Sequence, residues 1–380
     1  MAEDFLLLTP GPTPLAEEVM DALKRPILHH RTPQFQAILQ EVAEGLKKLF
    51  RTQETVYLMA ASGTGAMETA VANLISAGDT AIVIRGGKFG ERWGELVEAY
   101  GGRAVAIDVT WGQAASPEEI EKVLKANPTA KAVFTTLLET STGVRSDIKG
   151  YAQVTAKTSA VLVVDAISGV GCEALETDQW GIDCVVSGSQ KGLMLPPGLA
   201  FITLSQKAWK QVEAGSSPRY YFSLPKMKKV WEKKQDTPFT PAIGLIVALS
   251  EALKLLLTEG VEQVLARHGK NAEAVRSAMA AMGLEVFSDA SCTANGVTAV
   301  KVPDGVDGKK LVKMMRDEHG IMIAGGQAEL AGKIFRVASM GAIRAEDLRR
   351  AIGALEEVLT KLGWKFPQGA GQQALDGAIK

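Results

Sequence analysis

The sequence predicts an α/β protein in which a large domain with a mostly parallel seven-stranded sheet is followed by a smaller C-terminal α+β domain. Short β-branched and apolar runs alternate with helical segments, which is typical of parallel sheets covered on both faces. A chain of 380 residues is long enough for two domains and a large core. The seven expected strands lie at residues 56–60, 81–84, 104–107, 132–135, 160–164, 184–187 and 200–203.

The chain divides into three segments on this pattern. Residues 1–51 form an N-terminal arm that we expect to pack on the small domain, residues 52–250 form the large domain, and residues 251–380 form the small domain. Within the large domain, Ser116 precedes Pro and two Glu and predicts the start of a helix over residues 116–126.

The small domain is expected to have fewer strands. We predict strands at 285–287, 297–302 and 334–338 and a helix over 345–362. The tail after Trp364 is rich in Gln, Gly and Ala, so we expect it to be loosely ordered.

Composition excludes several classes of function. Lys and Arg number 42 against 43 Asp and Glu, so the net charge is −1 and nothing indicates a nucleic-acid surface. The three cysteines, Cys172, Cys184 and Cys292, have neither metal-ligand spacing nor a disulfide framework. They are expected to be buried small hydrophobic residues, as in a reducing, cytoplasmic location.

Membrane association and targeting are not expected. The start over residues 1–4 is acidic, and the apolar run at 5–8 is too short for a signal core. The longest apolar stretch, residues 242–257, is interrupted by polar residues and falls short of the roughly 20 residues that cross a bilayer. It predicts a buried helix.

Lys191 is the first candidate for chemistry. It follows the run at 184–187 after small, turn-forming residues, where desolvation would lower the pKa of its amine. A neutral lysine amine can attack a carbonyl, and such lysines bind pyridoxal phosphate (PLP) as Schiff bases. The run at 160–164 ends on Asp165, a carboxylate suited to the protonated ring nitrogen of PLP. Lys191 and Asp165 therefore predict a PLP site.

A glycine-containing turn predicts the place of the cofactor phosphate. Ser62, Gly63, Thr64 and Gly65 follow an apolar strand and open a helix, whose free N–H groups carry partial positive charge. The turn matches neither the dinucleotide fingerprint nor a Walker sequence. Together with Asp165 and Lys191 it supplies contacts for the phosphate, ring nitrogen and aldehyde of one cofactor.

These motifs, in this order and spacing, resemble those of the class V aminotransferases of fold type I. The resemblance is to the group of alanine–glyoxylate, serine–glyoxylate and serine–pyruvate aminotransferases, and it covers essentially the whole chain. It implies a PLP-dependent homodimer with active sites at the subunit interface, on which the N-terminal arm also packs. The matching segments are residues 9–14, 62–65, 139–143, 164–166, 187–191, 196–198 and 335–337.

The resemblance implies a role for each matching residue. Lys191 would hold the cofactor and later move a proton, and Asp165 would keep the ring nitrogen protonated. Phe89 would stack on the ring, where the family commonly has tryptophan, and Ile167 would pack on the other face. The implied cofactor-binding set is Ser62, Gly63, Thr64, Gly65, Phe89, Thr140, Asp165, Ile167, Gln190 and Lys191, with Thr237 and Thr240 reaching the phosphate of the neighbouring subunit.

Arg336 matches the arginine that holds the substrate carboxylate through two parallel hydrogen bonds. Gly11, within the segment 9–14, would also line the substrate site. His30 and Arg31 resemble a segment near the site entrance or dimer contact, and we expect interface packing rather than catalysis. No metal site is expected, because the other histidines are scattered along the chain.

The resemblance implies ping-pong transamination from alanine or serine to glyoxylate or pyruvate. A single arginine binds a single carboxylate, and no second guanidinium for a larger partner is evident, although Arg31, Arg85, Arg92 and Arg219 remain open. Residues 338–341 lack the histidine that relatives often carry before Met-Gly, which leaves the orientation of the substrate open.

Three other functions remain as alternatives. A cysteine desulfurase needs a nucleophilic cysteine on a loop, and Cys292 matches no such loop. A phosphoserine-type aminotransferase needs further basic residues for the substrate phosphate. A non-catalytic accessory subunit of a soluble hydrogenase-type complex has no need of an intact set of Lys191, Asp165 and Arg336, and no iron–sulfur ligand pattern indicates redox work.

Overall fold

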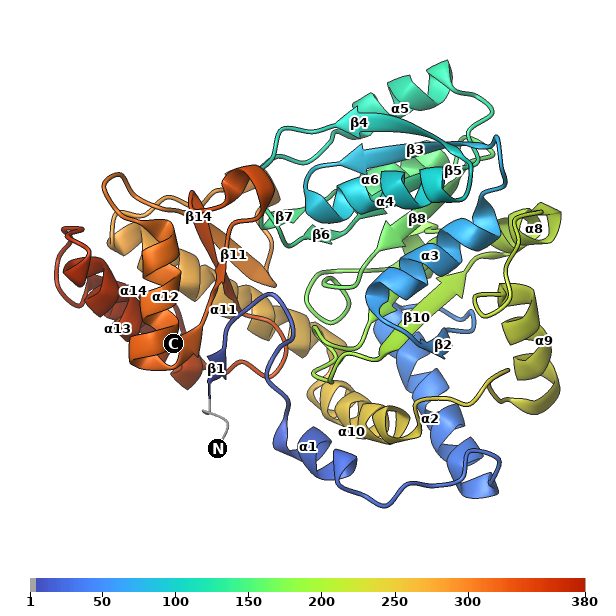
Figure 1. The fold of residues 1–380 in the computed structure, drawn as a ribbon, viewed down its shortest axis with the longest axis horizontal. Coiled ribbons are helices and arrows are strands. Elements are labelled where there is room, and N and C mark those ends of the chain that lie inside the picture. Colours follow the sequence, from blue (N-terminus) through green and yellow to red (C-terminus); the bar gives the residue numbers. More distant parts are fainter. Residues whose placement is uncertain (1–4, 380) are drawn as a thin grey trace.

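The computed structural model describes residues 5–379, and the acidic start at residues 1–4 lies outside them. Figure 1 shows a larger lobe that carries a broad sheet and a smaller lobe that contains the C-terminal helices. The N-terminal segment runs between the two lobes. The predicted α/β class, with a large domain and a smaller α+β domain, is confirmed.

The large sheet has seven strands in the order β2-β10-β9-β8-β5-β3-β4. Neighbours from β9 to β4 pair in parallel, whereas β10 runs antiparallel to both β9 and β2. The mostly parallel sheet predicted from the apolar runs is therefore confirmed. The strands are β2 (Tyr57–Ala60), β3 (Thr80–Arg85), β4 (Arg103–Asp108), β5 (Ala132–Thr136), β8 (Val161–Asp165), β9 (Cys184–Gly188) and β10 (Leu199–Leu204).

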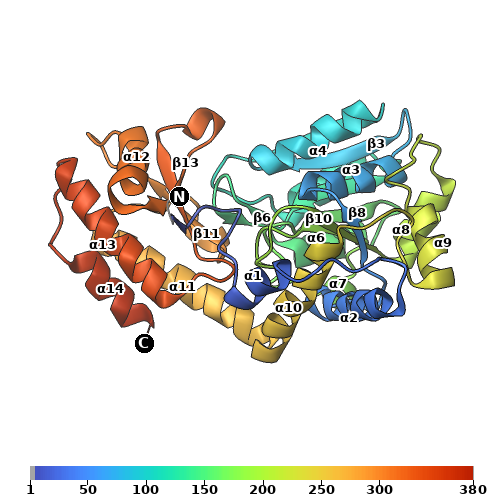
Figure 2. The ribbon, with the colours of Figure 1, turned by 60° about the horizontal axis from the view of Figure 1, so that its bottom comes forward.

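Both faces of this sheet are covered, which explains its continuous apolar strands. In β8, Leu162 and Val164 belong to one core cluster, and Val161 and Val163 belong to another on the opposite face. Figure 2 shows α3 and α4 on one side of the sheet and α2 on the other. The first side holds α3 (Gly63–Leu74), α4 (Lys88–Ala99), α8 (Gln206–Ala214) and α9 (Leu224–Lys234); the second holds α2 (Pro33–Phe50), α5 (Pro117–Ala126), α6 (Ile148–Thr155) and α10 (Ile243–Glu259).

The predicted start of α5 is confirmed by a reciprocal pair of hydrogen bonds. The Ser116 hydroxyl accepts from the Glu119 amide at 3.2 Å, and the Glu119 carboxylate accepts from the Ser116 amide at 2.7 Å. This capping box satisfies two amides that the first helical turn leaves without partners. Short elements elsewhere are α7 (Thr177–Trp180), β6 (Leu138–Glu139) and β7 (Val144–Arg145).

The small lobe has a three-stranded antiparallel sheet in the order β11-β14-β13. The predicted strand at 285–287 is wrong in extent, because only an isolated bridge joins Val286 to Val300. The elements are α11 (Val261–Ala281), η1 (Ala290–Cys292), β11 (Val297–Lys301), α12 (Gly308–His319), β12 (Ile321–Met322), β13 (Ala324–Gly325), η2 (Ala328–Leu330), β14 (Ile334–Ala338), α13 (Ala345–Lys361) and α14 (Ala370–Ile379).

The expectation of a loosely ordered tail is wrong. Within the tail, residues Ala370–Ile379 form α14, which packs against α11 and α13. Its Leu375 is fully buried in the core of the small lobe, so the apolar residues scattered among Gln and Gly gain a helical face to bury.

The N-terminal arm contacts both lobes. Its strand β1 (Leu6–Leu7) pairs in parallel with β12 of the small lobe. Its helices α1 (Glu17–Leu23) and α2 instead pack against α10, within the core cluster of the large sheet. No helix between residues 5 and 379 is long and apolar enough to cross a membrane.

Candidate active site

Asp165 and Lys191 come from neighbouring parallel strands. Asp165 ends β8 and continues the row of Val161 and Val163, which faces α3 and α4. Lys191 follows the end of β9, the next strand in the sheet. Carboxyl ends of parallel strands meet at one edge, where ligands bind in open α/β sheets. The two predicted residues therefore lie at the same edge of the sheet.

Burial shifts the pKa of both groups toward the neutral form. It raises the pKa of Asp165 to about 7, although the carboxylate accepts a hydrogen bond of 2.8 Å from the Ile167 amide. Burial lowers the pKa of the Lys191 amine to about 8, while the charge of Asp165 opposes this shift and the charge of Arg336 adds to it. The amine thus lies within electrostatic range of groups from both lobes.

The N-terminal arm covers Lys191. The Lys191 amine donates a hydrogen bond to the Pro10 carbonyl, and the Thr13 hydroxyl donates to the Lys191 carbonyl at 2.9 Å. At Gly11, where φ is +125°, an added Cβ would lie 2.5 Å from the Lys191 nitrogen. Only glycine suits this backbone conformation and this close approach. The structure thus brings Gly11 against Lys191, as the predicted site requires.

The phosphate-binding turn lies against the ends of β8 and β9. A Cβ at Gly63 would lie 2.6 Å from the side chain of Ile167, and one at Gly188 would lie 3.2 Å from the Cα atom of Gly63. Ser62 precedes α3, whose first amides are available to an anion. The geometry brings the predicted phosphate turn, Ile167 and the end of β9, which precedes Lys191, together.

Gln190 carries a buried polar atom that fits a missing ligand. Its Oε1 receives no hydrogen bond from residues 5–379, although it is buried beside Gly188. Rotating the amide would present two N–H donors to a phosphate oxygen. A buried polar group needs a partner, and an anion at the start of α3 would supply one. These residues therefore fit the phosphate of PLP.

Phe89 is positioned by Glu139, the first residue of the matching segment 139–143. One carboxylate oxygen accepts from the Phe89 and Gly90 amides at 3.0 and 2.9 Å. The other accepts from the amide and hydroxyl of Ser141 at 3.1 and 2.5 Å. Burial raises the pKa of Glu139, and these four hydrogen bonds favour its charged form. The buried carboxylate therefore holds the start of α4, which carries Phe89.

Arg336 enters the site from β14 of the small lobe. Its guanidinium donates to the Gly325 carbonyl through Nε at 3.0 Å and through Nη2 at 2.7 Å. Its Nη1 donates to the Thr140 carbonyl of the large lobe at 2.7 Å. Burial lowers the pKa of Arg336 to about 10, so it remains charged at neutral pH. These contacts orient the guanidinium and leave two of its five N–H groups for a carboxylate.

Thr237 and Thr240 do not join this set. They lie near Ala60 of β2 and line a small hollow with Tyr221. The Arg31 guanidinium pairs with the carboxylate of Asp236 beside them, and it also donates to the Thr237 carbonyl at 3.3 Å. His30 packs against His29 with ring centroids 4.9 Å apart.

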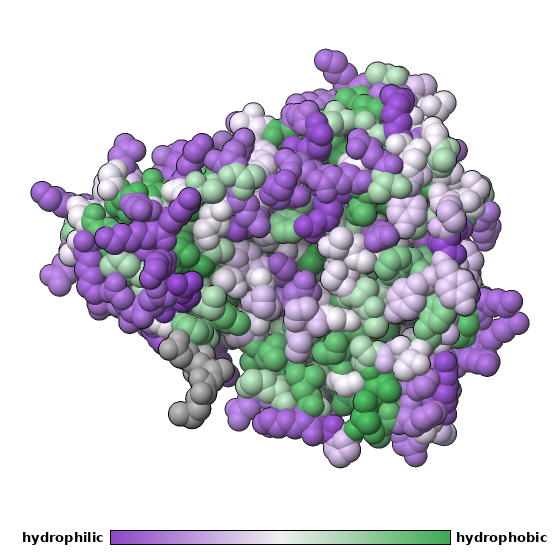
Figure 3. All heavy atoms as spheres, viewed as in Figure 1, coloured by the Kyte–Doolittle hydropathy of each residue, from purple (hydrophilic) through white to green (hydrophobic). Residues whose placement is uncertain are grey.

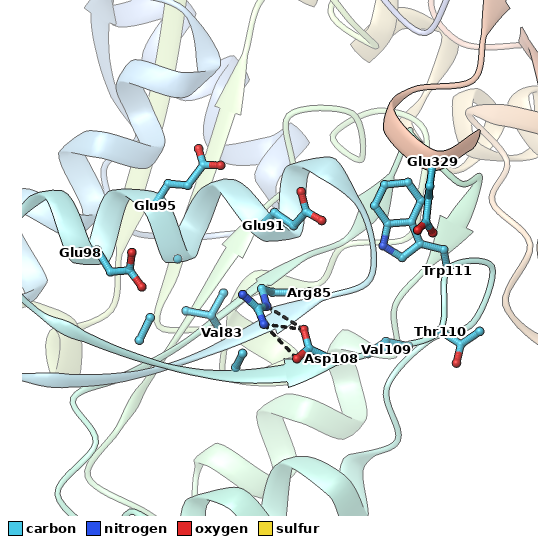
Figure 4. Close-up of a pocket in the computed structure, with 13 residues that line it drawn as sticks. Val83, Arg85, Glu91, Glu95, Glu98, Asp108, Val109, Thr110, Trp111 and Glu329 are labelled. Atoms are coloured by element: carbon cyan, nitrogen blue, oxygen red, sulfur yellow. Dashed lines mark hydrogen bonds and ion pairs between the residues drawn. The ribbon is translucent and has the colours of Figure 1, made fainter. Parts of the chain in front are cut away.

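A second hollow of about 640 Å³ lies over β3, β4 and α4. Figure 4 shows Glu91, Glu95 and Glu98 along α4 above it and an ion pair between Arg85 and Asp108 on its floor. None of the predicted catalytic, cofactor-binding or substrate-binding residues lines this hollow, and Arg85, which the sequence left open as a second guanidinium, is paired with Asp108 there.

Cys292 does not present a nucleophile. Its thiol is buried and contacts the carbonyls of Gly112 and Asp289. Burial also raises the pKa of this thiol, whereas a reactive cysteine needs a lowered one. In the described part of the chain, no group of three or more His, Cys, Asp or Glu residues could hold a metal ion.

Comparison with known proteins identifies the class. Residues 6–346 match the family model of the class-V aminotransferases, and the chain belongs to this family. It is accordingly a PLP-dependent aminotransferase that acts on amino acid and keto acid substrates.

Several relatives match over nearly the full length. The chain is 41% identical to a soluble hydrogenase small subunit of Synechococcus sp., over 98% of each chain. It is 35% identical to an L-aspartate–glyoxylate aminotransferase of Paracoccus denitrificans, over 97% of this chain and 94% of the relative. It is 36% identical to a serine–glyoxylate aminotransferase of Methylorubrum extorquens, over 98% of this chain and 96% of the relative.

Solved structures share the whole architecture. Ureidoglycine–glyoxylate aminotransferase from Bacillus subtilis matches with a TM-score of 0.96 and 30% identity, over 100% of this chain and 98% of that one. Alanine–glyoxylate aminotransferase from Nostoc sp. matches with a TM-score of 0.91 and 32% identity, over 94% and 96%.

Proposed function

We propose that this aminotransferase transfers the amino group of alanine or serine to glyoxylate or pyruvate by a ping-pong mechanism. The observation that carries the proposal is that Asp165 and Lys191 lie at one edge of the sheet, while carbonyls of both lobes orient the guanidinium of Arg336. An amine with a lowered pKa, a buried acid and an oriented guanidinium are what a 2-amino acid needs beside PLP.

Bound PLP supplies an electron sink for a carbanion and carries the amino group between the two substrates. Lys191 would hold the cofactor and, once released, remove the proton from the α-carbon, because its lowered pKa leaves part of the amine neutral. Asp165 would accept a hydrogen bond from the ring nitrogen, and that positive partner would favour the charged carboxylate.

Arg336 would bind the carboxylate that both substrates share. Its contacts to the Gly325 and Thr140 carbonyls fix the plane of the guanidinium before substrate arrives. Phe89 and Ile167 would flank the ring. Ser62, Gly63, Thr64, Gly65 and Gln190 would hold the phosphate, and Thr140 would lie near the ring oxygen.

Small donors are favoured because Arg336, which carbonyls of both lobes orient, supplies one guanidinium for one carboxylate. The serine–glyoxylate relative and the alanine–glyoxylate structure support serine and alanine as donors. The relative named for aspartate makes aspartate the most useful comparison, because its second carboxylate would need another cation.

The active form would be a homodimer. Ile27 and Tyr220 expose 79% and 73% of their surface, and Met20 exposes 43%. In Figure 3, hydrophobic side chains also gather along the lower edge of the molecule, where Figure 1 has α1 and α10. Such surfaces mark interaction sites. The Arg31–Asp236 pair would hold Thr237 and Thr240 for the phosphate of the partner.

The test is to add alanine, serine or aspartate, without a 2-oxo acid, to the PLP-loaded protein and follow the absorption of the lysine-bound cofactor. Alanine or serine should discharge this absorption fastest, and subsequent glyoxylate or pyruvate should restore it. Faster discharge by aspartate would overturn the substrate class.

The relative named as a hydrogenase subunit gives the main alternative, a non-catalytic accessory chain. In an accessory chain without catalytic activity, we expect no amino acid to discharge the absorption of the lysine-bound cofactor. A protein that binds PLP but responds to no amino acid across a broad panel would favour that alternative.

A further inference from the structure

Arg92 touches two parts of the cofactor site that come from different helices. Its Nη1 donates a hydrogen bond of 3.2 Å to the hydroxyl of Thr64, in the first turn of α3. Its guanidinium carbon lies 5.0 Å from the ring centroid of Phe89, one turn earlier on α4. The side chain therefore joins the phosphate-binding turn to the aromatic residue expected to stack on the ring.

The charge of Arg92 has no carboxylate partner within ion-pair distance among residues 5–379. Its neighbours on the chain differ, because Arg85 pairs with Asp108, and Lys88 pairs with Glu91. A guanidinium without a carboxylate partner can pair with an anion that enters the site. The cofactor phosphate is such an anion.

The rest of the phosphate turn is neutral. Ser62, Gly63, Thr64, Gly65 and Gln190 offer hydrogen bonds but no full positive charge. The amides that begin α3 contribute only a partial charge. A phosphate ester with nearly two negative charges is better matched by a guanidinium, whose planar donors suit its oxygens.

The positive charge of Arg92 also reaches the reacting groups. Burial is the main cause of the pKa shifts of Asp165 and Lys191, and the charge of Arg92 makes a smaller contribution that lowers both pKa values. Arg92 is thus within electrostatic range of both residues.

We propose that Arg92 is a cofactor-binding residue that neutralises the phosphate of PLP at the turn formed by Ser62 to Gly65. This inference rests on the proposed placement of the phosphate at that turn. Arg92 would act together with Thr64, and its position over Phe89 would couple phosphate binding to the orientation of the stacking ring.

The experiment compares two ligands that differ only in the phosphate. PLP and unphosphorylated pyridoxal are titrated into cofactor-free protein, and attachment to Lys191 is followed by absorption. Arg92→Met should weaken PLP binding by about 10–100-fold, the range expected for a hydrogen bond to a charged group, and leave pyridoxal binding within about twofold. Arg92→Lys should recover part of the loss because it keeps the charge.

Arg85→Met is the matched control. It removes a positive charge just before α4, in the hollow of Figure 4, where Arg85 contacts Asp108 rather than the site. PLP affinity should be unchanged in this variant, and the unfolding midpoint of each variant should confirm folding.

Three results would overturn the proposal. Equal losses of PLP and pyridoxal would make Arg92 a structural support for Phe89. Unchanged PLP affinity with a raised KM for substrates would place it at the substrate instead. If Arg92→Met changed neither PLP affinity nor KM, Arg92 would not be a residue of the site. Failure of wild-type protein to attach either ligand at Lys191 is a distinct outcome, which contradicts the proposed site itself and with it this inference.

Discussion

Arg336 donates a hydrogen bond of 2.7 Å from Nη1 to the carbonyl oxygen of Thr140, and this contact joins the central strand of the small lobe to the large lobe. Thr140 directly follows Glu139, whose carboxylate holds the amides of Phe89 and Gly90. One short segment therefore contacts both the arginine proposed for the substrate and the helix that carries the aromatic residue proposed for the cofactor.

Replacing Arg336 with lysine should impair substrate use and spare cofactor binding. Lysine keeps one charge but cannot make two parallel hydrogen bonds to a carboxylate while also contacting Gly325 and Thr140. We expect kcat/KM for the amino donor to fall by about 10–100-fold, mainly through KM. Steady-state kinetics measure this change. An equal loss of PLP affinity would mean that Arg336 supports the fold rather than the substrate.

The attachment of PLP to Lys191 should have an unusual pH dependence. With a pKa of about 8, roughly a tenth of the amine is neutral at pH 7, against fewer than about one in a thousand for an ordinary lysine. Only the neutral amine attacks a carbonyl, so the attachment rate in cofactor-free protein should rise with pH and level off above about pH 8. Stopped-flow absorption over pH 6–10 measures it. A rate still climbing steeply near pH 10 would contradict the lowered pKa.

Glu139→Gln should loosen the start of α4. The substituted amide keeps one acceptor oxygen but turns an NH₂ group toward two of the four donors at Phe89, Gly90 and Ser141. Leaving buried donors without partners should cost about 1–3 kcal/mol in the free energy of unfolding, measured by denaturant titration.

If Glu139 acts on the cofactor through Phe89, the effects of Glu139→Gln and Phe89→Leu on PLP affinity should be less than additive in the double variant. Additive effects would assign Glu139 to stability alone.

Leu375→Ala should destabilise the protein although it lies in the C-terminal tail. Leu375 is fully buried in the core of the small lobe, so its truncation should lower the free energy of unfolding by about 2–5 kcal/mol. Gln373→Ala, on the exposed side of the same helix, is the control and should change stability little. Equal stability of both variants would show that α14 is not docked in solution.

The sequence predicts the large sheet because each strand depends on a short run of neighbouring residues. Each strand of the large domain is a short apolar run, and the residues that end β8 and β9 carry their chemistry at predictable positions. The expectation of a loosely ordered tail is wrong for a related reason. Helix α14 has a buried face, but its apolar residues are too few to predict a helix without the surface of α11 that covers them.

The parts of the site that escaped prediction are contacts between distant segments. Glu139 bonds to backbone amides 50 and 49 residues earlier, and Pro10 accepts from a lysine 181 residues later. Backbone N–H and C=O groups are the same in almost every residue type, so the sequence pattern cannot predict which of them a side chain will contact. These hydrogen bonds follow from the folded arrangement of the two lobes.

The segment from Leu8 to Pro10 is a short connection between the small lobe and Lys191. Leu8 bonds to Met322 and Ala338 of the small lobe at 2.8 Å in each case, and two residues later Pro10 accepts from the Lys191 amine. Two residues of extended chain span at most about 7 Å. The small lobe, which carries Arg336, can therefore move away from Lys191 only by a short distance before the hydrogen bonds at Leu8 or the one at Pro10 must break.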